Sequence, residues 1–323
     1  MVMNEVWTKY GDSLVESVKY IEDRASGKVK SLKTGWKQFD NIGYGGLEWG
    51  SFYLIASRPG VGKTLIINQL TRNIQKLNKD EDPYILHFQF EMDKKNLAAR
   101  ELSSATGLRL RYLLSSKEQD VDKLSQEHLK QLKTYVNSQY YNRNEYVIDK
   151  QMSVDEIKYY VYEFYKKFKK PFIATLDHTM LIKKTAGEPK KQTTIENFSN
   201  MAIESKKELP MIWIVGSQLN RTLESAERQN PGKLTNFPTS DDIYMSDALM
   251  QGCDVVLAYN RPAKYNLKFY GPTSYVLSLD DKNLLACHIL KNRFGNDGIH
   301  WYRALYDKMS VIETEAPKKR SEL

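Results

Sequence analysis

Short apolar runs alternate along the chain with longer stretches in which apolar residues recur at helical spacing among charged ones. Runs such as YILHFQF (84–90) and MIWIVGS (211–217) are bounded by turn residues and are typical of buried strands. Stretches such as VDEIKYYVYEFYKKF (154–168) indicate helices that pack one face against a core. This alternation predicts an α/β fold, with a mostly parallel sheet and helices on both of its faces.

The predicted elements run from residue 52 to residue 305. Strands are expected at 52–56, 84–90, 171–177, 211–217, 254–258, 284–290 and 299–305. Helices are expected from Lys63 onward and at 93–107, 154–168 and 195–209, with a polar insertion at about 260–283. We find no internal repeat.

An amphipathic helix is predicted at residues 4–26, before the alternating elements. Its apolar positions are Val6, Tyr10, Leu14, Val18 and Ile21. The stripe must be buried either on another subunit or back on its own domain. The chain therefore divides into a linker helix (1–33), a main domain (34–310) and a charged tail (311–323) that we expect to be disordered.

The composition is that of an ordinary globular chain of 323 residues, with 41% hydrophobic content. The apolar runs are too short to span a membrane and the N-terminus lacks a signal pattern, so we expect a cytoplasmic protein without membrane attachment. Cys253 and Cys287 fit neither a zinc site nor a disulfide framework, and burial is expected for both. A formal charge of +8 favours a polyanionic partner such as nucleic acid, although charge alone does not select one.

The segment SRPGVGKT, from Ser57 to Thr64, joins a predicted buried strand to a predicted helix. It matches the phosphate-loop pattern G-x-x-x-x-G-K-[ST] at its last three positions and has Ser57 in place of the first glycine. Pro59 and Gly60 shape the turn so that backbone N–H groups and the positive helix N-terminus face a polyphosphate.

In this loop Lys63 would pair with the β- and γ-phosphates of ATP, and the Thr64 hydroxyl would ligate Mg²⁺. The expected ligands are therefore ATP and Mg²⁺. The expected nucleotide-binding residues are Ser57, Arg58, Pro59, Gly60, Val61, Gly62, Lys63, Thr64 and Leu65.

Two acidic residues follow predicted strands, where a nucleotide hydrolase needs acids. Asp177 ends the apolar run FIATLD and suits a direct or second-sphere Mg²⁺ ligand, or else a turn aspartate. Glu91 ends the strand at 84–90 and could polarise the attacking water, or else be a solvated loop residue.

Seven segments are specific in combination: TGWKQFD, GGLEWGSFYLIASRPGVGKT, FQFEM, FIATLDHTMLIK, VGSQLNRTLE, DIYMSDALMQGCDVV and LKNRFGNDG. In this order and spacing they resemble the RecA-like motor domain of DnaB-type hexameric replicative helicases, over about 34–306. In that family the first phosphate-loop glycine is often a small residue, which accommodates Ser57. The resemblance implies a RecA-like phosphate-loop fold and an ATP hydrolase that unwinds DNA.

The resemblance also implies roles for individual residues. Glu91 looks like the catalytic base and Asp177 like the Mg²⁺-associated acid. Arg100, in EMDKKNLAAR, matches a family arginine near the nucleotide, with a surface helix arginine as the alternative. Gln218 resembles the polar sensor that links the γ-phosphate to the DNA-facing loops, with a structural glutamine as the alternative.

Lys291 and Arg293 in LKNRFG resemble the family's trans-acting finger, which reaches the nucleotide bound by the adjacent subunit. A cation that arrives from a neighbour stabilises the charge on the transferring phosphoryl group and makes hydrolysis depend on assembly. Without the resemblance, two basic residues at a strand end would be a solvated turn.

The family's linker helix docks on the adjacent subunit and ties a ring together, and we predict this for residues 4–26. The loops after Asp177 and Gln218 would then face the central channel and grip DNA phosphates without reading bases. The expected DNA-binding residues are Lys183, Lys184, Lys190, Lys191, Arg221 and Tyr244.

The sequence departs from the family at two places. Where many members carry an Arg-Glu-Ser-Gly run, this chain has Tyr244, Met245, Ser246 and Asp247, so a phosphate-binding arginine is replaced and an acid is added. Only about 33 residues precede the motor, whereas full-length cellular members carry a helical domain that contacts primase. This size suggests a phage or mobile-element version.

The leading hypothesis is an ATP-dependent replicative DNA helicase, a homo-oligomeric ring, expected to be hexameric, that moves on single-stranded DNA. A helicase loader or a primase is a candidate partner. Two alternatives stay open: a recombination or repair ATPase of the RecA/RadA type, and a nucleotide-switched DNA-binding scaffold. The SQLNR and KNRFG segments favour the helicase over the recombinase, and Glu91 with the candidate finger argues against a pure switch.

Overall fold

The computed structural model describes residues 7–115, 124–140, 142–185, 187–188, 190–230, 235–244, 247–278 and 281–322. Its strands are β1 (Phe52–Ser57), β2 (Tyr84–Gln89), β3 (Glu145–Ile148), β4 (Phe172–Asp177), β5 (Met211–Gln218), β6 (Val255–Asn260), β7 (Phe269–Tyr270), β8 (Tyr275–Val276), β9 (Leu284–Asn292), β10 (Gly298–Leu305) and β11 (Ser310–Glu313). Its helices are α1 (Tyr10–Ala25), α2 (Lys37–Asp40), α3 (Lys63–Leu77), α4 (Lys94–Thr106), α5 (Leu110–Leu114), α6 (Gln126–Gln139), α7 (Val154–Phe168), α8 (Lys191–Glu208) and α9 (Asp247–Gly252).

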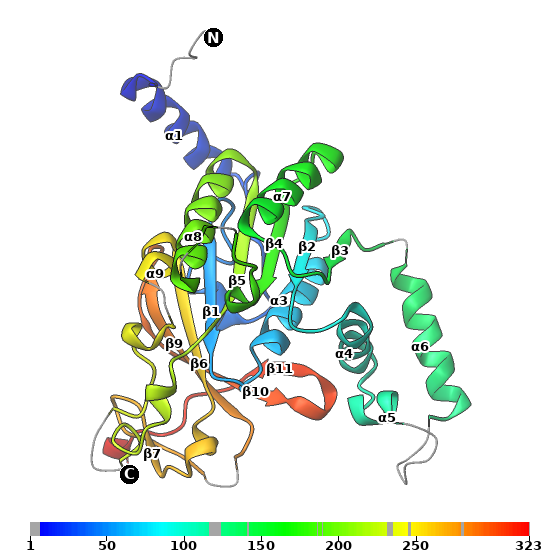
Figure 1. Cartoon of the computed structure of the whole chain (residues 1–323), viewed down its shortest axis with the longest axis vertical. Coiled ribbons are helices and arrows are strands. Elements are labelled where there is room, and N and C mark those ends of the chain that lie inside the picture. Colours follow the sequence, from blue (N-terminus) through cyan, green and yellow to red (C-terminus); the bar gives the residue numbers. More distant parts are fainter. Residues whose placement is uncertain are drawn as a thin grey trace.

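Nine of these strands form one sheet, in the order β11-β10-β9-β6-β1-β5-β4-β2-β3 (Figure 1). The six strands from β6 to β3 are parallel, and β9, β10 and β11 extend the sheet in antiparallel fashion. Strands β1, β4 and β6 are buried along their whole length, as expected where helices cover both faces of a parallel sheet. The predicted mostly parallel α/β fold is confirmed.

Parallel pairing brings the carboxyl ends of several strands to one edge of the sheet. Ser57 at the end of β1 lies opposite Gln218 at the end of β5. Asp177 at the end of β4 lies opposite Gln89 at the end of β2. Ligands of open α/β sheets bind at this edge, and the candidate residues that follow these strands are therefore neighbours in space.

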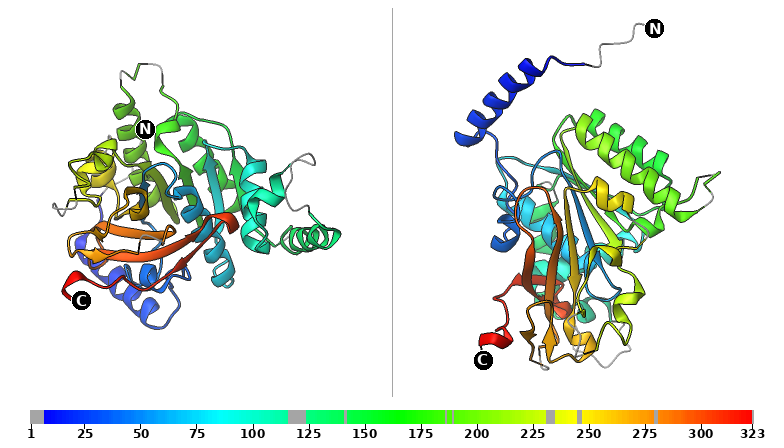
Figure 2. Two further views of the ribbon diagram at one scale, coloured as in Figure 1. Left: turned by 90° about the horizontal axis from the view of Figure 1, so that it is seen from below. Right: turned by 90° about the vertical axis from the view of Figure 1, so that its left-hand side faces the viewer.

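Separate apolar clusters lie on the two faces of the sheet. Helices α7 and α8 pack on one face through side chains such as Ile157 and Phe198. Helix α3 covers the other face together with the segment that carries Leu32, Trp36 and Leu47. Figure 2 shows the sheet between these two layers.

Helix α1 projects away from the rest of the chain (Figures 1 and 2) and buries none of its residues. Trp7, just before it, is 78% exposed, and Tyr10 is 77% exposed. Its C-terminal end is held to the main domain by Arg24, whose Nη1 lies 2.7 Å from Glu48 Oε2. Apart from this end, the described residues of the main domain do not cover the helix. The first residues of the predicted helix, including Val6, lie outside the described residues.

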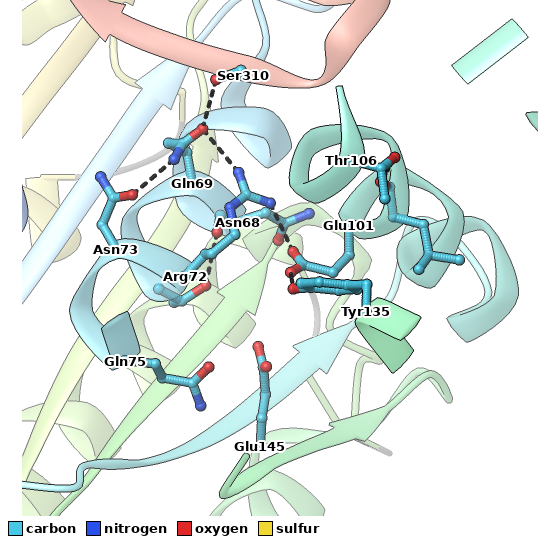
Figure 3. A network of polar contacts seen from close by, with 12 residues as sticks. Asn68, Gln69, Arg72, Asn73, Gln75, Glu101, Thr106, Tyr135, Glu145 and Ser310 are labelled. Atoms are coloured by element: carbon cyan, nitrogen blue, oxygen red, sulfur yellow. Dashed lines mark hydrogen bonds and ion pairs between the residues drawn. The ribbon is translucent and has the colours of Figure 1, made fainter. Parts of the chain in front are cut away.

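Helices α4 and α6 are joined to α3 by a polar network that also reaches β3 (Figure 3). The carboxylate of Glu101 on α4 accepts hydrogen bonds from Arg72 on α3 at 2.7 Å and from Tyr135 on α6 at 2.7 Å. Arg143 donates to the same carboxylate at 2.8 Å and also contacts Glu145 at the start of β3. These bonds position α4, which carries Arg100, relative to the helix that begins in the phosphate loop.

The C-terminal segment corrects the expectation of a disordered tail from residue 311. Residues 310–313 form the edge strand β11, in which Val311 is buried against α3. Further on, the N–H of Val276 donates to the Lys318 carbonyl at 2.8 Å, and the N–H of Arg320 donates to the Ser274 carbonyl at 3.1 Å. A charged segment can thus be ordered through its backbone when a neighbouring strand offers unpaired groups. In the part of the chain that the structure describes, no helix is long and apolar enough to cross a membrane.

Candidate nucleotide-binding site

The phosphate loop connects β1 to α3 with two glycines in the left-handed region. Gly60 has a φ of +73° and Gly62 a φ of +112°, conformations that cost little only for glycine. A Cβ on Gly62 would also lie 3.3 Å from a ring carbon of Tyr306. The turn therefore delivers the chain to Lys63 with the unpaired N–H groups of the α3 N-terminus facing the loop, an arrangement that favours an anion.

Lys63 and Thr64 meet Asp177 at the end of β4. The Lys63 ammonium contacts one oxygen of the Asp177 carboxylate, and the Thr64 hydroxyl contacts the other. Gly216 on β5 makes room for them, because a Cβ there would lie 2.9 Å from Asp177 Oδ1 and 3.0 Å from Lys63 Cδ. A hydroxyl and a carboxylate side by side are the hard oxygen donors that Mg²⁺ takes, so these residues fit the ion.

A cavity of about 270 Å³ opens above the phosphate loop. Among its lining residues are Glu91, Arg100 and Gln218, which sequence reasoning assigned to one site. Val61 is the exception among the predicted loop residues, because its side chain is buried in the core and does not line the cavity. Its carbonyl instead accepts a hydrogen bond from the Tyr306 hydroxyl at 2.7 Å.

Glu91 follows β2 at the rim of the cavity, with its side chain half exposed. Its carboxylate lies 4.0 Å from Nε2 of His178. Burial, together with the positive charge of Lys63, lowers the pKa of His178 to about 4, so the imidazole is neutral at pH 7. A neutral ring leaves Glu91 free of a strong ion pair on that side, and its carboxylate stays available as a base.

Arg100 and Gln218 reach the cavity from two directions. Arg100 extends from α4, and its Nη1 lies 3.5 Å from the Met309 sulfur beside the cavity. Gln218 lies at the end of β5, where its carbonyl accepts a hydrogen bond from the Tyr244 N–H at 3.0 Å. Gln218 thus stands at the junction between the cavity and the long loop that follows β5.

Sequence reasoning missed several residues around this site. His178, Tyr306 and Met309 line the cavity, and Lys264 donates to the Pro59 carbonyl at 2.6 Å. Tyr306 and Met309 lie beyond β10 and Lys264 lies in the polar insertion, far along the chain from any motif. His178 had a signal, since it directly follows Asp177 at the strand end.

Lys291 and Arg293 lie away from the cavity. Strand β9 runs antiparallel to β6, so the C-terminal end of β9 lies beside the start of β6. This is the end of the sheet opposite the phosphate loop. Lys291 donates to the Gln251 carbonyl at 3.0 Å, and Arg293 Nη1 lies 3.0 Å from Asp254 Oδ1. The Arg293 side chain is 54% exposed.

The predicted DNA-binding residues follow β4 and β5, on the same edge as the phosphate loop. Lys183, Lys184, Lys190 and Arg221 are exposed, and Tyr244 is half-buried. Lys191 instead turns inward to the Ile182 carbonyl, and burial lowers the pKa of its ammonium. Met245 and Ser246, at which the sequence departs from the family, lie outside the described residues.

Among the described residues, no three His, Cys, Asp or Glu side chains group into a metal site of their own. Both cysteines are buried, as predicted, and neither is in a disulfide. Burial raises the pKa of the Cys287 thiol to about 12, so it is not a nucleophile at neutral pH.

The chain matches known proteins over most of its length. Residues 31–305 match the family model of the DnaB-like helicase C terminal domain. "Replicative DNA helicase DnaB" of Helicobacter pylori (strain J99 / ATCC 700824) is 26% identical over 263 residues, which are 80% of this chain and 49% of that protein. "Probable plasmid replicative DNA helicase" of Chlamydia trachomatis serovar L2 is 24% identical over 237 residues, 72% of this chain and 47% of that protein. The chain thus spans about half the length of the curated relatives it matches.

Two solved structures share the fold. One, whose title describes an ATPase domain, has a TM-score of 0.78 at 22% identity, over 96% of this chain and all of that chain. The structure titled "The Structure Of A DnaB-Like Replicative Helicase And Its Interactions With Primase" has the same TM-score and identity, over 95% of this chain and 69% of that chain. The RecA-like fold that the motifs indicated is confirmed.

Proposed function

Because the chain belongs to the family of DnaB-like helicase C-terminal domains, we propose that it is an ATP-driven helicase motor that moves along single-stranded DNA. The observation that carries the proposal is the convergence of Lys63, Thr64 and Asp177 beneath a cavity that Glu91 also lines. Phosphate binding alone would not need an acid at the rim of the cavity. ATP hydrolysis needs both the residues that bind the phosphates and Mg²⁺ and an acid that activates the attacking water.

The residues at the cavity have different roles in the proposed hydrolysis, according to their chemistry. The N–H groups of the phosphate loop and the Lys63 ammonium bind the β- and γ-phosphates. Thr64 and Asp177 would hold Mg²⁺, which neutralises phosphate charge when bound. Glu91 orients a water and accepts its proton, while Arg100 adds positive charge from the side of α4.

The proposed finger residues belong to the site of a neighbouring copy. Arg293 lies at the opposite sheet edge from its own phosphate loop and is more than half exposed. In a closed head-to-tail ring each copy presents one edge to the cavity of the next. We assign Lys291 and Arg293 this trans role, which makes hydrolysis depend on assembly.

Helix α1 is the proposed tie between subunits, because its apolar stripe is uncovered among the described residues of its own chain. Single-stranded DNA would lie against the loops after β4 and β5, with Lys183, Lys184, Lys190 and Arg221 facing its phosphates. Lys191 has a smaller part here than the sequence indicated, because its ammonium is held by a backbone carbonyl. A helicase loader and primase are the candidate protein partners.

The test is steady-state ATP hydrolysis with and without single-stranded DNA, with the oligomer mass read in parallel by native mass spectrometry. We expect DNA to stimulate hydrolysis in a ring-sized oligomer. Glu91→Gln and Arg293→Ala should each lower the rate about 10²-fold or more, a loss that added ATP does not restore. Asp80→Asn, which makes an acid-to-amide change at a side chain that is 89% exposed, is the matched control for Glu91 and should behave as the parent.

Slow hydrolysis by a monomer that ignores DNA would contradict the motor. That result would favour a nucleotide-switched scaffold. Stimulation that survives Arg293→Ala would leave a motor but remove the trans finger.

A further inference from the structure

Arg58 links the phosphate loop to the loop that follows β5. Its side chain is only 7% exposed, although the residue belongs to the nucleotide-facing turn. Nη1 donates to the Leu219 carbonyl at 2.8 Å, and Nη2 donates to Glu224 Oε2 at 2.9 Å. The planar guanidinium thus holds both a backbone carbonyl and a carboxylate of the second loop, a pairing that lysine could not reproduce.

On the other side of this contact lies the loop that follows β5, which we call the β5 loop and describe here at residues 219–230 and 235–244. Asp242 closes it, because its carboxylate accepts two hydrogen bonds from Arg228 at 2.9 Å each and one from the Thr239 N–H at 2.8 Å. The Asp242 carbonyl also accepts from the Asn220 N–H at 2.6 Å. A displacement of one part of such a hydrogen-bonded segment moves the rest, because packed and bonded elements shift as units.

The charges around Glu224 tie it to the phosphate loop. The hydrogen bond from Arg58 lowers the pKa of the Glu224 carboxyl, which is therefore ionised at neutral pH. Lys264 adds a second positive charge nearby while it donates to the Pro59 carbonyl. When phosphate charge enters the turn that carries Arg58, the guanidinium is attracted to two anions at once, and its hold on Glu224 changes.

We propose that the contact of Arg58 with Glu224 transmits occupancy of the phosphate loop to the β5 loop, and so sets the response of this loop to DNA. Glu224 acts here as a positioning residue, because it lies on the turn Arg221–Glu224 and does not line the cavity. The part that concerns DNA depends on the helicase function proposed above. The part that concerns nucleotide does not.

The experiment compares Glu224→Ala and Glu224→Gln with Asp241→Asn in the full chain. Asp241 is an exposed acid on the same loop, so the control removes the same negative charge without touching Arg58. The first readout is hydrogen exchange of the β5 loop with and without a non-hydrolysable ATP analogue and Mg²⁺. The second is the ratio of ATP hydrolysis with and without single-stranded DNA.

In the parent and in Asp241→Asn, we expect the analogue to slow exchange in the β5 loop. In Glu224→Ala this change should disappear, and DNA stimulation should fall about fivefold or more. Analogue affinity and basal hydrolysis should stay within about twofold of the parent. Glu224→Gln keeps a neutral hydrogen-bond acceptor for Arg58. Its nucleotide-dependent exchange and its DNA stimulation should lie between those of the parent and those of Glu224→Ala, which provides a readout even if Glu224→Ala folds poorly.

Two outcomes would overturn the inference: a nucleotide effect on the β5 loop that is the same in the parent and in both Glu224 variants, or no such effect in the parent. Failure of the helicase function is a separate result. If DNA does not stimulate the parent while exchange in the β5 loop still depends on nucleotide and on Glu224, the helicase proposal fails and the nucleotide coupling stands.

Discussion

Gly216 shows how a single missing side chain shapes the nucleotide site. A Cβ at this position would lie 2.9 Å from Asp177 Oδ1 and 3.0 Å from Lys63 Cδ. Gly216→Ala should therefore displace the two side chains without unfolding the sheet. We expect the Kd of an ATP analogue to rise about tenfold or more, which corresponds to about 1.4 kcal/mol.

Fluorescence titration with a labelled nucleotide, with thermal unfolding in parallel, measures this effect. Gly11→Ala is the matched control, because a Cβ on Gly11 meets no atom within 4 Å. A variant that binds nucleotide as the parent does would show that Lys63 and Asp177 do not need their present positions.

His288 is a buried histidine whose charge state affects stability. Burial lowers its pKa to about 3. Tyr270 is its titratable neighbour, with the hydroxyl 2.8 Å from His288 Nε2. Because Asn260 donates to the Tyr270 oxygen at 3.0 Å, the Tyr270 hydroxyl proton is left to donate to an unprotonated Nε2. The fold thus requires the neutral ring.

The pH dependence follows from the sign of that shift. The pKa of His288 in the folded protein lies below its unfolded value of about 6.5. The contribution of the neutral ring to the free energy of unfolding is therefore fully present above pH 6.5. It is lost as pH falls toward 3, by up to about 1.4 kcal/mol per pH unit. Urea unfolding of the parent and His288→Gln at pH 7.5 and pH 5 measures it, because the other titrating groups cancel in the difference. The parent's advantage should shrink by about 2 kcal/mol at pH 5. An advantage independent of pH would contradict the neutral ring.

At the scale of elements, the network around Glu101 holds α4 and α6 to α3. Glu101→Ala would leave Arg72, Arg143 and Tyr135 without a shared acceptor. We expect a loss of about 2–3 kcal/mol in the free energy of unfolding, because Arg72 loses its carboxylate partner and Arg143 keeps one of two, Glu145, at partly buried positions. Glu163→Ala removes an exposed carboxylate paired with Lys166 and should cost less than about 1 kcal/mol. Equal denaturant midpoints for the two variants would show that the network does not hold these helices.

Strands with a continuous apolar run were predictable, and a short edge strand and one of the helices were not. Strands β1 and β4 are fully buried, so each appears in the sequence as a mostly apolar run that ends at a residue of the site. The short edge strand β3 is half exposed, and α6 buries none of its residues. Strand β3 is too short to show a clear alternation. Helix α6 was missed although Leu129, Leu132 and Val136 recur at helical spacing. The network of Glu101 and its partners holds this helix in place together with that weak apolar face.

The same reasoning applies to the site. Lys63, Thr64 and Asp177 sit at strand and helix ends that local sequence defines, and the sequence assigned all three to one nucleotide site, although it did not predict that they contact one another. Tyr306 and Lys264 reach the phosphate loop from segments about 200 residues or more away along the chain. Only the order of strands in the sheet brings them there, and no local pattern encodes that order.

At the scale of the whole molecule, α1 is an amphipathic helix whose apolar stripe is uncovered in the part of the chain that the structure describes. Leu14 is 52% exposed and Val18 is 56% exposed. Because about half of each side chain is still exposed, burying the rest on a neighbouring copy would contribute about 1 kcal/mol each. The double variant Leu14→Glu with Val18→Glu should therefore lower the oligomer mass while leaving the thermal unfolding of the main domain nearly unchanged.

Native mass spectrometry over a range of protein concentrations measures the change. Lys19→Glu is the matched control, because it alters formal charge by the same amount on α1, outside the apolar stripe. If both variants dissociate alike, charge is responsible and the stripe is not. If neither dissociates, the main domains assemble without α1, and the exposed stripe binds something other than a second copy. Dissociation of the double variant alone, together with loss of DNA-stimulated hydrolysis, would join α1 to the trans role of Arg293, because a finger can act only while a neighbour is held in place.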